Sequence, residues 1–117
     1  MSKDNNYDGT SFFGKLDFLM INVALLWEED LNATERMLMG TVLGLHHNND
    51  AGCFASNTYL ARVLNLSKSR TSALLTKLKR KGYIKIGFVR DQYSGKVVKR
   101  YVIPLKYNEI YDAWFSE

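Results

Sequence analysis

The chain has 117 residues, of which 46% are hydrophobic and 24% charged, so there is room for one globular domain with one core. Its aromatic residues (2 Trp, 7 Tyr and 6 Phe) exclude global disorder, and its single cysteine, Cys53, excludes a disulfide scaffold. No apolar run reaches the ~18 residues of a membrane-spanning helix, and the polar, acidic start does not resemble a signal peptide. We therefore expect a cytoplasmic protein with no membrane association.

The net charge of +4 is distributed very unevenly along the chain. Residues 1–61 hold three basic and eight acidic residues, a net charge of −5. Residues 62–106 hold thirteen basic residues and one acid, Asp91, a net charge of +12, and residues 107–117 carry −3. Such asymmetry indicates a polyanionic partner, either nucleic acid or an anionic membrane surface. The alternative is a solvated lysine-rich face, and the choice depends on whether the basic residues lie on a recognisable docking element.

The N-terminal region is predicted to begin with a flexible arm over residues 1–15, because its first dozen residues are rich in Asn, Asp, Gly and Ser. A short strand or extended piece around Phe18 and Ile21 follows, and then a helical turn over Val23–Trp27. These elements open the globular domain, which we place at residues 16–106.

The first long helix is predicted to begin after Asn32. Asn32 and Glu35 have the spacing of a capping box, in which each side chain bonds the backbone N–H of the other residue. Apolar and small side chains at the spacing i, i+3, i+4, i+7 predict one buried face, namely Leu38, Thr41, Val42 and Leu45. The polar residues from His46 to Gly52 are expected to end the helix in a loop, and Met39 and Leu43 lie off its main stripe.

The next segment predicts two helices joined by a tight turn. Cys53–Ala55 is short enough for a single bridge-like strand, and Ser56 is a good N-cap for a helix over Asn57–Leu64. After the turn at Asn65 and Leu66, Ser67 caps a second helix over Lys68–Lys81 that stops at Gly82. The buried stripe of this second helix has helical spacing: Thr71, Leu74, Leu75 and Leu78. Helix, short turn, helix is the layout of the helix-turn-helix motif.

After Gly82 the hydrophobic period changes from 3.6 to 2. Tyr83–Val89 is predicted as a strand, Arg90–Gly95 as a polar turn, and Lys96–Ile103 as the returning strand, which Pro104 ends. A β-hairpin directly behind the second helix is the wing of a winged helix. The last segment, residues 107–117, is expected to form a short C-terminal helix over Asn108–Phe115. The predicted fold class is α+β, mainly α, of the winged helix-turn-helix type.

Three runs of this region resemble one winged-helix family: residues 53–61, residues 66–71 and residues 78–84. The family comprises the N-terminal DNA-binding domains of plasmid replication initiators and phage replisome organisers of Gram-positive bacteria. The upstream pattern of Leu31, Glu35, Leu38, Gly40 and Leu45 is also similar, so the resemblance covers residues 18–103. At the position of Thr71 the family commonly has Val, and a Thr side chain occupies the same volume as Val. The resemblance implies duplex DNA binding at repeated sites of a replication origin, with other replication proteins as partners.

In a helix-turn-helix, the N-terminal part of the second helix approaches base edges in the major groove. The second helix (residues 68–81) turns its apolar stripe inward, so its predicted DNA-facing residues are Ser69, Arg70, Ser72, Ala73 and Thr76. Lys68 and Lys77 lie on the flanks. Arg70 is the leading candidate for base reading, because its planar fork matches guanine O6 and N7. Ser56 and Ser67 are expected to contact phosphate in addition to capping their helices. On the wing (residues 83–103), the predicted contacts cluster around the tip: Arg90, Tyr93, Lys96, Lys99 and Arg100.

Several residues have a structural interpretation beside the functional one. Lys79 is a further candidate phosphate contact, whereas Arg80 and Lys81 end a helix where cations are favoured with or without DNA. Tyr83 and Tyr101 are expected to pack in the hairpin rather than to stack on bases. Adjacent histidines followed by one cysteine lack the spaced ligand pairs of a zinc site, so we expect no metal and no cofactor. No nucleophile or phosphate loop is present in the sequence, so we expect no enzyme activity.

Association and biological role remain open at the level of the sequence. Helix-turn-helix proteins commonly bind as twofold dimers, and we hypothesise a homodimer. The apolar residues of the C-terminal helix (Ile110, Tyr111, Trp114 and Phe115), together with Met39 and Leu43, either close the core or face a second subunit. The alternatives to a replication initiator are a transcriptional regulator of the winged-helix type and a winged helix used as a protein-interaction module.

Overall fold

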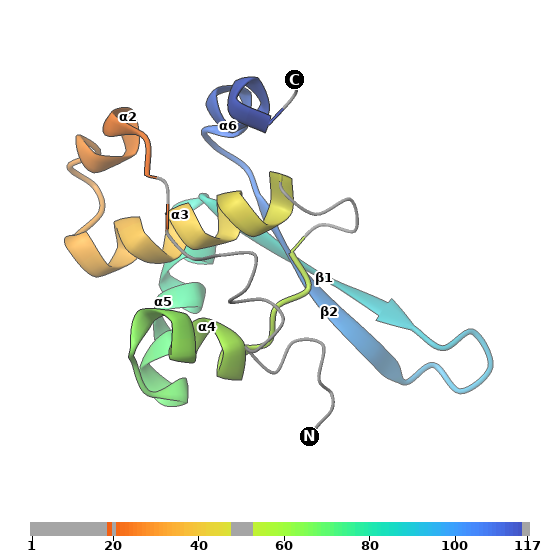
Figure 1. Ribbon diagram of the computed structural model, residues 1–117. Coiled ribbons are helices and arrows are strands. Elements are labelled where there is room, and N and C mark those ends of the chain that lie inside the picture. Colours follow the sequence, from red (N-terminus) through yellow and green to blue (C-terminus); the bar gives the residue numbers. More distant parts are fainter. Residues whose placement is uncertain (1–18, 20, 48–52, 116–117) are drawn as a thin grey trace.

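The computed structural model of the protein describes residues 19, 21–47 and 53–115. For residues 114 and 115 it describes the backbone alone. Its elements follow in the order α2 (Val23–Leu26), α3 (Ala33–His47), α4 (Asn57–Leu64), α5 (Lys68–Lys81), β1 (Ile84–Arg90), β2 (Val97–Pro104) and α6 (Asn108–Phe115). In Figure 1, α3 crosses the middle of the molecule, α2 and α6 lie on one side of it, and α4 and α5 lie on the other. The hairpin of β1 and β2 projects away from the helices (Figure 1). This is the winged helix-turn-helix fold, mainly helical α+β, that the sequence predicts.

Helix α3 is the centre of the hydrophobic core. Leu38 and Val42 of the predicted stripe have no exposed surface, and neither do Met39 and Leu43 outside it. Because elements pack against α3 from both sides, the helix is apolar over much more than one stripe. Of the two roles considered for Met39 and Leu43, the structure therefore favours the core of the same chain over a second subunit.

The start of α3 has the predicted capping box. The backbone N–H of Asn32 donates to Glu35 Oε1 at 2.8 Å, and the backbone N–H of Glu35 donates to Asn32 Oδ1 at 2.9 Å. The end of the helix differs from the prediction, because α3 continues through His46 and His47. Both histidines stay in the helix because the side chain of His47 contacts polar side chains of α6. Its Nδ1 lies 2.7 Å from the Asp112 carboxylate.

The helix-turn-helix is formed by local signals that the sequence displays. The side chain of Ser56 accepts a bond from the backbone N–H of Tyr59 at 3.1 Å, and that of Ser67 accepts one from Arg70 at 3.0 Å. Between the helices, Asn65 adopts a left-handed conformation with φ 58°, which Asn tolerates better than most residues. Gly82 ends α5 with φ 88°, where a side chain would be strained.

The wing is a two-stranded antiparallel hairpin with one irregularity, next to Val89 and Arg90. At its base, Cys53 forms an isolated bridge to Val102, which confirms the single bridge-like strand. In mid-hairpin, the ring of Tyr101 lies across Gly87, where an added Cβ atom would clash with that ring. Tyr83 is buried, so both tyrosines pack in or beneath the hairpin as predicted.

The remaining predictions on the termini have separate outcomes. The helical turn after Asn22 is confirmed as α2, whereas Ile21 lies in no strand and packs against the core beside Gly40. The predicted arm over residues 1–15, Phe18 and the loop residues 48–52 lie outside the described residues. No helix in the described part of the chain is both long and apolar enough to cross a membrane.

Candidate nucleic-acid interface

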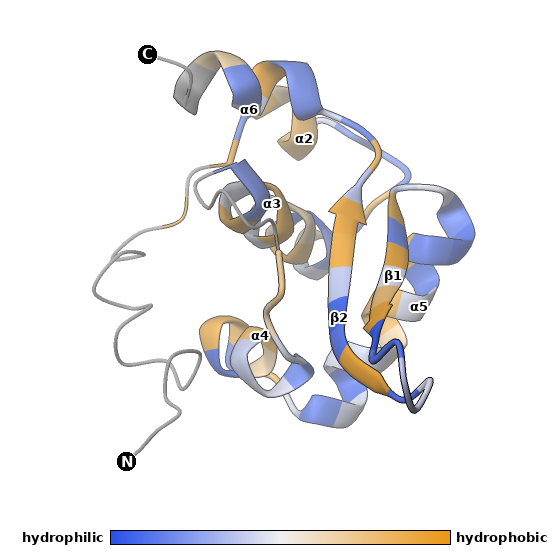
Figure 2. Ribbon diagram, turned by 90° about the vertical axis from the view of Figure 1, so that its right-hand side faces the viewer, coloured by the Kyte–Doolittle hydropathy of each residue, from blue (hydrophilic) through white to orange (hydrophobic). Residues whose placement is uncertain are grey.

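Helix α5 separates into a buried stripe and an exposed face, as its sequence predicts. Thr71, Leu74, Leu75 and Leu78 are buried against the core. The exposed residues are small, polar or cationic: Lys68, Ser69, Arg70, Ser72, Ala73, Thr76, Lys79 and Arg80. Figure 2 shows this hydrophilic colouring along α5, next to the hairpin. A convex helix surface with no acidic residue suits the major groove of DNA.

The N-terminal half of α5 carries the candidate base reader. Arg70 is exposed, and within the described part of the chain its guanidinium makes no ion pair. Its neighbours on the same face, Ser69 and Ala73, are small and also exposed. Small flanking side chains permit close approach of the helix backbone to base edges, so this half of α5 has the shape and chemistry of a reading surface.

In the C-terminal half of α5, Lys77 and Lys81 are engaged with the body of the protein, whereas Lys79 and Arg80 are exposed. The Lys77 ammonium lies 3.2 Å from Glu35 Oε2, and that of Lys81 lies 3.4 Å from Glu35 Oε1. Lys81 also donates to the carbonyl oxygen of Asp30. Lys77 lies on the flank of α5, as predicted, with 44% of its side chain exposed, and its ammonium also pairs with a buried carboxylate. Its predicted contact with phosphate stays a prediction. The sequence showed the cap formed by Glu35 but not these pairings across more than 40 residues.

The carboxylate of Glu35 has almost no exposed surface, at 1%. Burial is the largest influence on its pKa and raises it. The bond from the backbone N–H of Asn32 and the charges of Lys77 and Lys81 act in the opposite direction and outweigh burial, so the pKa lies below its ordinary value. Glu35 is thus an ionised group that joins the start of α3 to the end of α5.

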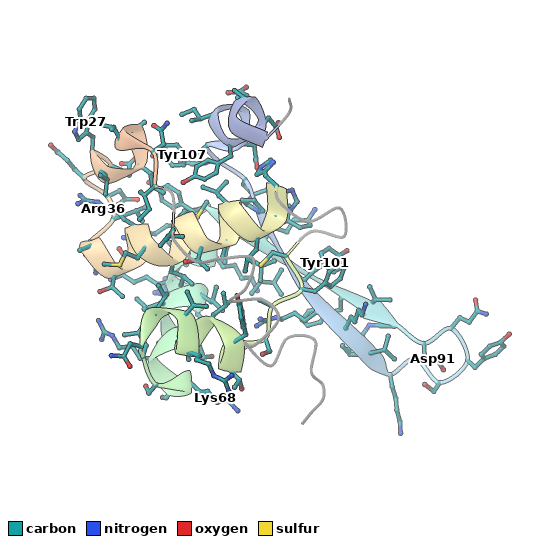
Figure 3. All side chains as sticks on the ribbon, in the orientation of Figure 1. Trp27, Arg36, Lys68, Asp91, Tyr101 and Tyr107 are labelled. Carbon is teal, nitrogen blue, oxygen red and sulfur yellow. The ribbon has the colours of Figure 1, made fainter. Side chains whose placement is uncertain are left out.

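The tip of the wing is a well-bonded turn. The Asp91 side chain accepts a bond from the backbone N–H of Ser94 at 2.8 Å, which also lowers the pKa of Asp91. The Arg90 guanidinium donates to the carbonyl oxygen of Gly95 at 3.1 Å. The turn presents Tyr93 with 89% of its surface exposed, and Lys96 is also exposed. Figure 3 labels Asp91 at this tip, far from the helices.

Arg100 does not lie at the tip, where the sequence predicted it. It is paired with Phe88 in mid-hairpin, and its guanidinium donates to Asn57 Oδ1 and to the carbonyl oxygen of Ala55, both at 2.7 Å. Arg100 therefore ties strand β2 to the start of α4, and its exposed surface is correspondingly reduced. Lys99 likewise lies away from the tip, with its ammonium 4.9 Å from the centre of the Phe54 ring.

A groove of about 540 Å³ lies between the wing and the helix-turn-helix. Its lining includes Ser56 at the start of α4, Lys68 at the start of α5, and Lys99 of β2. The structure thus brings together predicted contacts that are up to 44 residues apart in the sequence, from Ser56 to Arg100. It also adds Phe54 and Asn57, which the sequence did not single out, because neither is cationic and each lies beside the cap rather than on the second helix.

His47 and Cys53 both have contacts that explain them as parts of the fold. His47 Nε2 lies 2.8 Å from Asn108 Oδ1, so both nitrogens of that ring contact residues of α6. Cys53 is buried, and burial raises its pKa to about 11, so the thiol is not activated. Among the residues that the structure describes, no three His, Cys, Asp or Glu side chains are grouped so that they could hold a metal ion.

The fold and this surface define a class of protein, the winged helix-turn-helix proteins, whose second helix binds DNA. Residues 29–84 match a protein family described as a helix-turn-helix domain. The matched range includes α3, α4 and α5 and ends at the first residue of β1. The match supports a helix-turn-helix DNA-binding domain and confirms that part of the sequence prediction. Neither the curated proteins nor the solved structures gave a match to the chain.

Proposed function

We propose that the protein binds double-stranded DNA in a sequence-specific manner and acts in the initiation of replication of a plasmid or phage. Helix α5 enters the major groove with Arg70 as the leading base reader, and the wing reaches the adjacent minor groove or its flanking phosphates. The observation that carries DNA binding is the exposed face of α5, which holds cations and small polar side chains and no acid. The protein acts by binding, not by catalysis.

The distribution of charge further supports a polyanionic partner. From Arg62 to Lys106 the only acid in the sequence is Asp91, and its carboxylate is occupied with the turn at the tip of the wing. Glu35, from outside this segment, pairs with Lys77 and Lys81, whereas α5 itself contributes no carboxylate and the wing contributes only Asp91. A positive field of this kind accelerates the encounter with DNA and makes the affinity fall with salt.

The role in replication is supported by the resemblance of residues 53–61, 66–71 and 78–84 to the DNA-binding domains of initiators and replisome organisers. A transcriptional regulator would use the same docking surface, because the surface determines which molecule is bound and not the biological consequence of binding. The position of the binding sites in the genome separates the two roles.

Selection of bound duplexes from a random-sequence pool, at ~150 mM salt, tests the proposal. We expect a sharply enriched motif that recurs as direct or inverted repeats within a replication origin. Enrichment of a motif across promoters would assign a regulator instead. Retention of duplexes without any enrichment would contradict sequence-specific binding, and absence of duplex binding even at low salt would favour a protein-interaction module.

We further propose that two copies bind together as a homodimer. One recognition helix contacts only a few base pairs, and paired half-sites increase both affinity and specificity. Met39, Leu43 and Tyr111 are buried within one chain, so they do not supply the contact. Val23, Leu26 and Trp27 of the α2 region are exposed apolar residues that remain available for it. A molar mass of a single chain, measured by sedimentation at DNA-binding concentrations, would contradict the homodimer.

A further inference from the structure

The groove between the wing and the start of α4 is formed by three separate segments of the chain. Phe54, Ser56 and Asn57 come from one segment at the start of α4, Lys68 from the start of α5, and Lys99 and Arg100 from β2. None of the residues that line it is acidic, and three of them are cationic. A concave surface that collects cations from different elements has the chemistry to hold a phosphodiester chain.

The three cations of the groove differ in what they contact. Lys68 is exposed, and no ion pair of its ammonium occurs within the described part of the chain. Lys99 is exposed as well, and its ammonium lies over the ring of Phe54, which supports the side chain without neutralising the charge. Arg100 is different, because Asn57 and the carbonyl oxygen of Ala55 already occupy its guanidinium.

The bonds of Arg100 determine the shape of the groove. Both acceptors lie beside Ser56, the N-cap of α4, on the opposite wall from β2. One side chain of the wing thereby fixes the distance between the two walls and the position of the neighbouring Lys99. The hairpin has no helix packed over its outer half, since Phe88, Val97 and Val98 are exposed. The bonds of Arg100 are therefore well placed to hold the wing at a defined angle to the helices.

We propose that this groove holds the phosphodiester backbone of one strand of duplex DNA, with Lys68 and Lys99 as its phosphate ligands and Arg100 as the positioning residue that sets its width. This inference rests on the proposed function and deepens it. The start of α5 belongs both to the groove and to the recognition helix. A strand held in the groove therefore continues directly to the base edges that Arg70 approaches, and the groove sets the register of reading.

The test measures the affinity for a mixed-sequence 20-base-pair duplex at several salt concentrations. The variants are Lys68→Ala and Lys99→Ala, and the control is Lys85→Ala, which removes an exposed lysine of β1 that does not line the groove. Each groove variant is expected to reduce the slope of log affinity against log salt by about 0.9, the value for one phosphate contact. The control is expected to keep the slope of the wild-type protein.

Failure of this inference is distinguishable from failure of the proposed function. If the wild-type protein binds the selected DNA site and Arg70→Ala weakens that binding, while both groove variants keep the wild-type salt slope on the mixed-sequence duplex, the groove assignment is wrong and the function stands. If the wild-type protein does not bind the duplex at all, the function itself is wrong. Tighter binding of the corresponding single strand, with the same dependence on Lys68 and Lys99, would overturn the assignment to duplex DNA.

A double-mutant cycle between Arg100 and Lys99 tests the positioning role. If Arg100 acts by holding the groove, Lys99→Ala causes a smaller loss of affinity in the Arg100→Gln background than in the wild-type protein. If Arg100 contacts phosphate itself, Lys99→Ala reduces the affinity by the same factor in both backgrounds, and the positioning role is overturned. Thermal unfolding of each variant verifies that it folds, and the lysine variants test the groove even if Arg100→Gln does not fold.

Discussion

Both halves of helix α5 carry basic residues, two in residues 68–74 and four in residues 75–81, but the structure uses them differently. The N-terminal half exposes Arg70 among small neighbours, whereas Lys77 and Lys81 in the C-terminal half are paired with the buried carboxylate of Glu35. The same kind of side chain thus has two uses on one helix. We propose that the N-terminal half reads DNA, whereas Lys77 and Lys81 of the C-terminal half fix the helix to the body of the protein.

This comparison shows that the density of positive charge does not by itself locate a DNA contact. Exposure and existing partners decide whether a cation is available to phosphate or base. The wing shows the same distinction, since Arg100 is bound to Ala55 and Asn57 while Lys96 is exposed at the tip. A contact assigned from charge therefore needs the packing of the whole fold.

The largest expected effect is on DNA affinity, and it differs between the arginines of the two halves of α5, Arg70 and Arg80. Arg70→Ala is expected to weaken binding to the selected DNA site by about 10- to 100-fold, because a bidentate contact to guanine contributes about 1–3 kcal/mol. Arg80→Ala, the matched control on the C-terminal half, is exposed as well and is expected to change specific affinity by less than about threefold. Titrations with the selected site and with an unrelated duplex measure both effects. Equal losses for the two variants, or an equal loss on both DNAs, would remove the distinction.

The anchoring half is tested through the stability of the fold. Glu35→Gln keeps the shape of the side chain and removes its charge, so it weakens the cap of α3 and both ion pairs with α5. We expect the free energy of unfolding to fall by about 1–3 kcal/mol, as for hydrogen bonds to a charged group. Urea unfolding measures this change, with Glu29→Gln, an exposed carboxylate, as the control within about 0.5 kcal/mol. Equal stability of Glu35→Gln and the wild-type protein would show that the anchor is unimportant.

The anchor also predicts a dependence on pH. The pKa of Glu35 is lowered in the folded state, so the ionised carboxylate stabilises the fold fully above its ordinary pKa of 4.5, and this contribution is lost as the pH falls through the lowered value. The stability of the wild-type protein and that of Glu35→Gln are therefore expected to converge under acidic conditions. Urea unfolding between about pH 7 and pH 3 measures the difference in the free energy of unfolding between the two proteins. The contributions of the other carboxylates are the same in both proteins and cancel in this difference. A difference that stays constant over this range would contradict the ionised anchor.

The smallest effect concerns the tip of the wing. Tyr93 is 89% exposed, and the bonds of the turn are made by Asp91, Arg90 and Ser94 instead. Tyr93→Ala is expected to leave the free energy of unfolding within about 0.5 kcal/mol and to weaken DNA binding by about two- to fivefold. A fluorescence titration of DNA binding, accompanied by thermal unfolding, measures both quantities. A large loss of stability would show that the tip packs on the body of the protein.

The elements of the fold were predictable because their signals are local. Ser56 and Ser67 cap helices, Gly82 ends one, and the change of hydrophobic period after Gly82 starts the wing. The extension of α3 to His47 was missed because its cause, the contact with Asp112 in α6, lies 65 residues further along the chain. A boundary that depends on such a tertiary contact leaves no local signal in the sequence.

The candidate site was predictable only in part, for the same reason. The outward face of α5 follows from its periodicity, so Arg70 and its neighbours were found at exposed positions. The partners of Lys77 and Arg100 could not be predicted, because pairing with Glu35 or Asn57 depends on how distant segments meet. The groove was missed as a unit because its lining comes from segments that have no common sequence pattern.

Nuclear magnetic resonance gives the sharpest test of the proposed division of labour, in which the N-terminal half of α5 and the wing face DNA while the opposite half anchors the helix. Backbone and side-chain signals are followed while the selected duplex is added to the protein. We predict the largest changes at residues 67–76 and 90–100, small changes at residues 77–81, and almost none in α2 and α6. Largest changes around Trp27, which Figure 3 shows at the opposite end of the molecule from Lys68, would contradict this division.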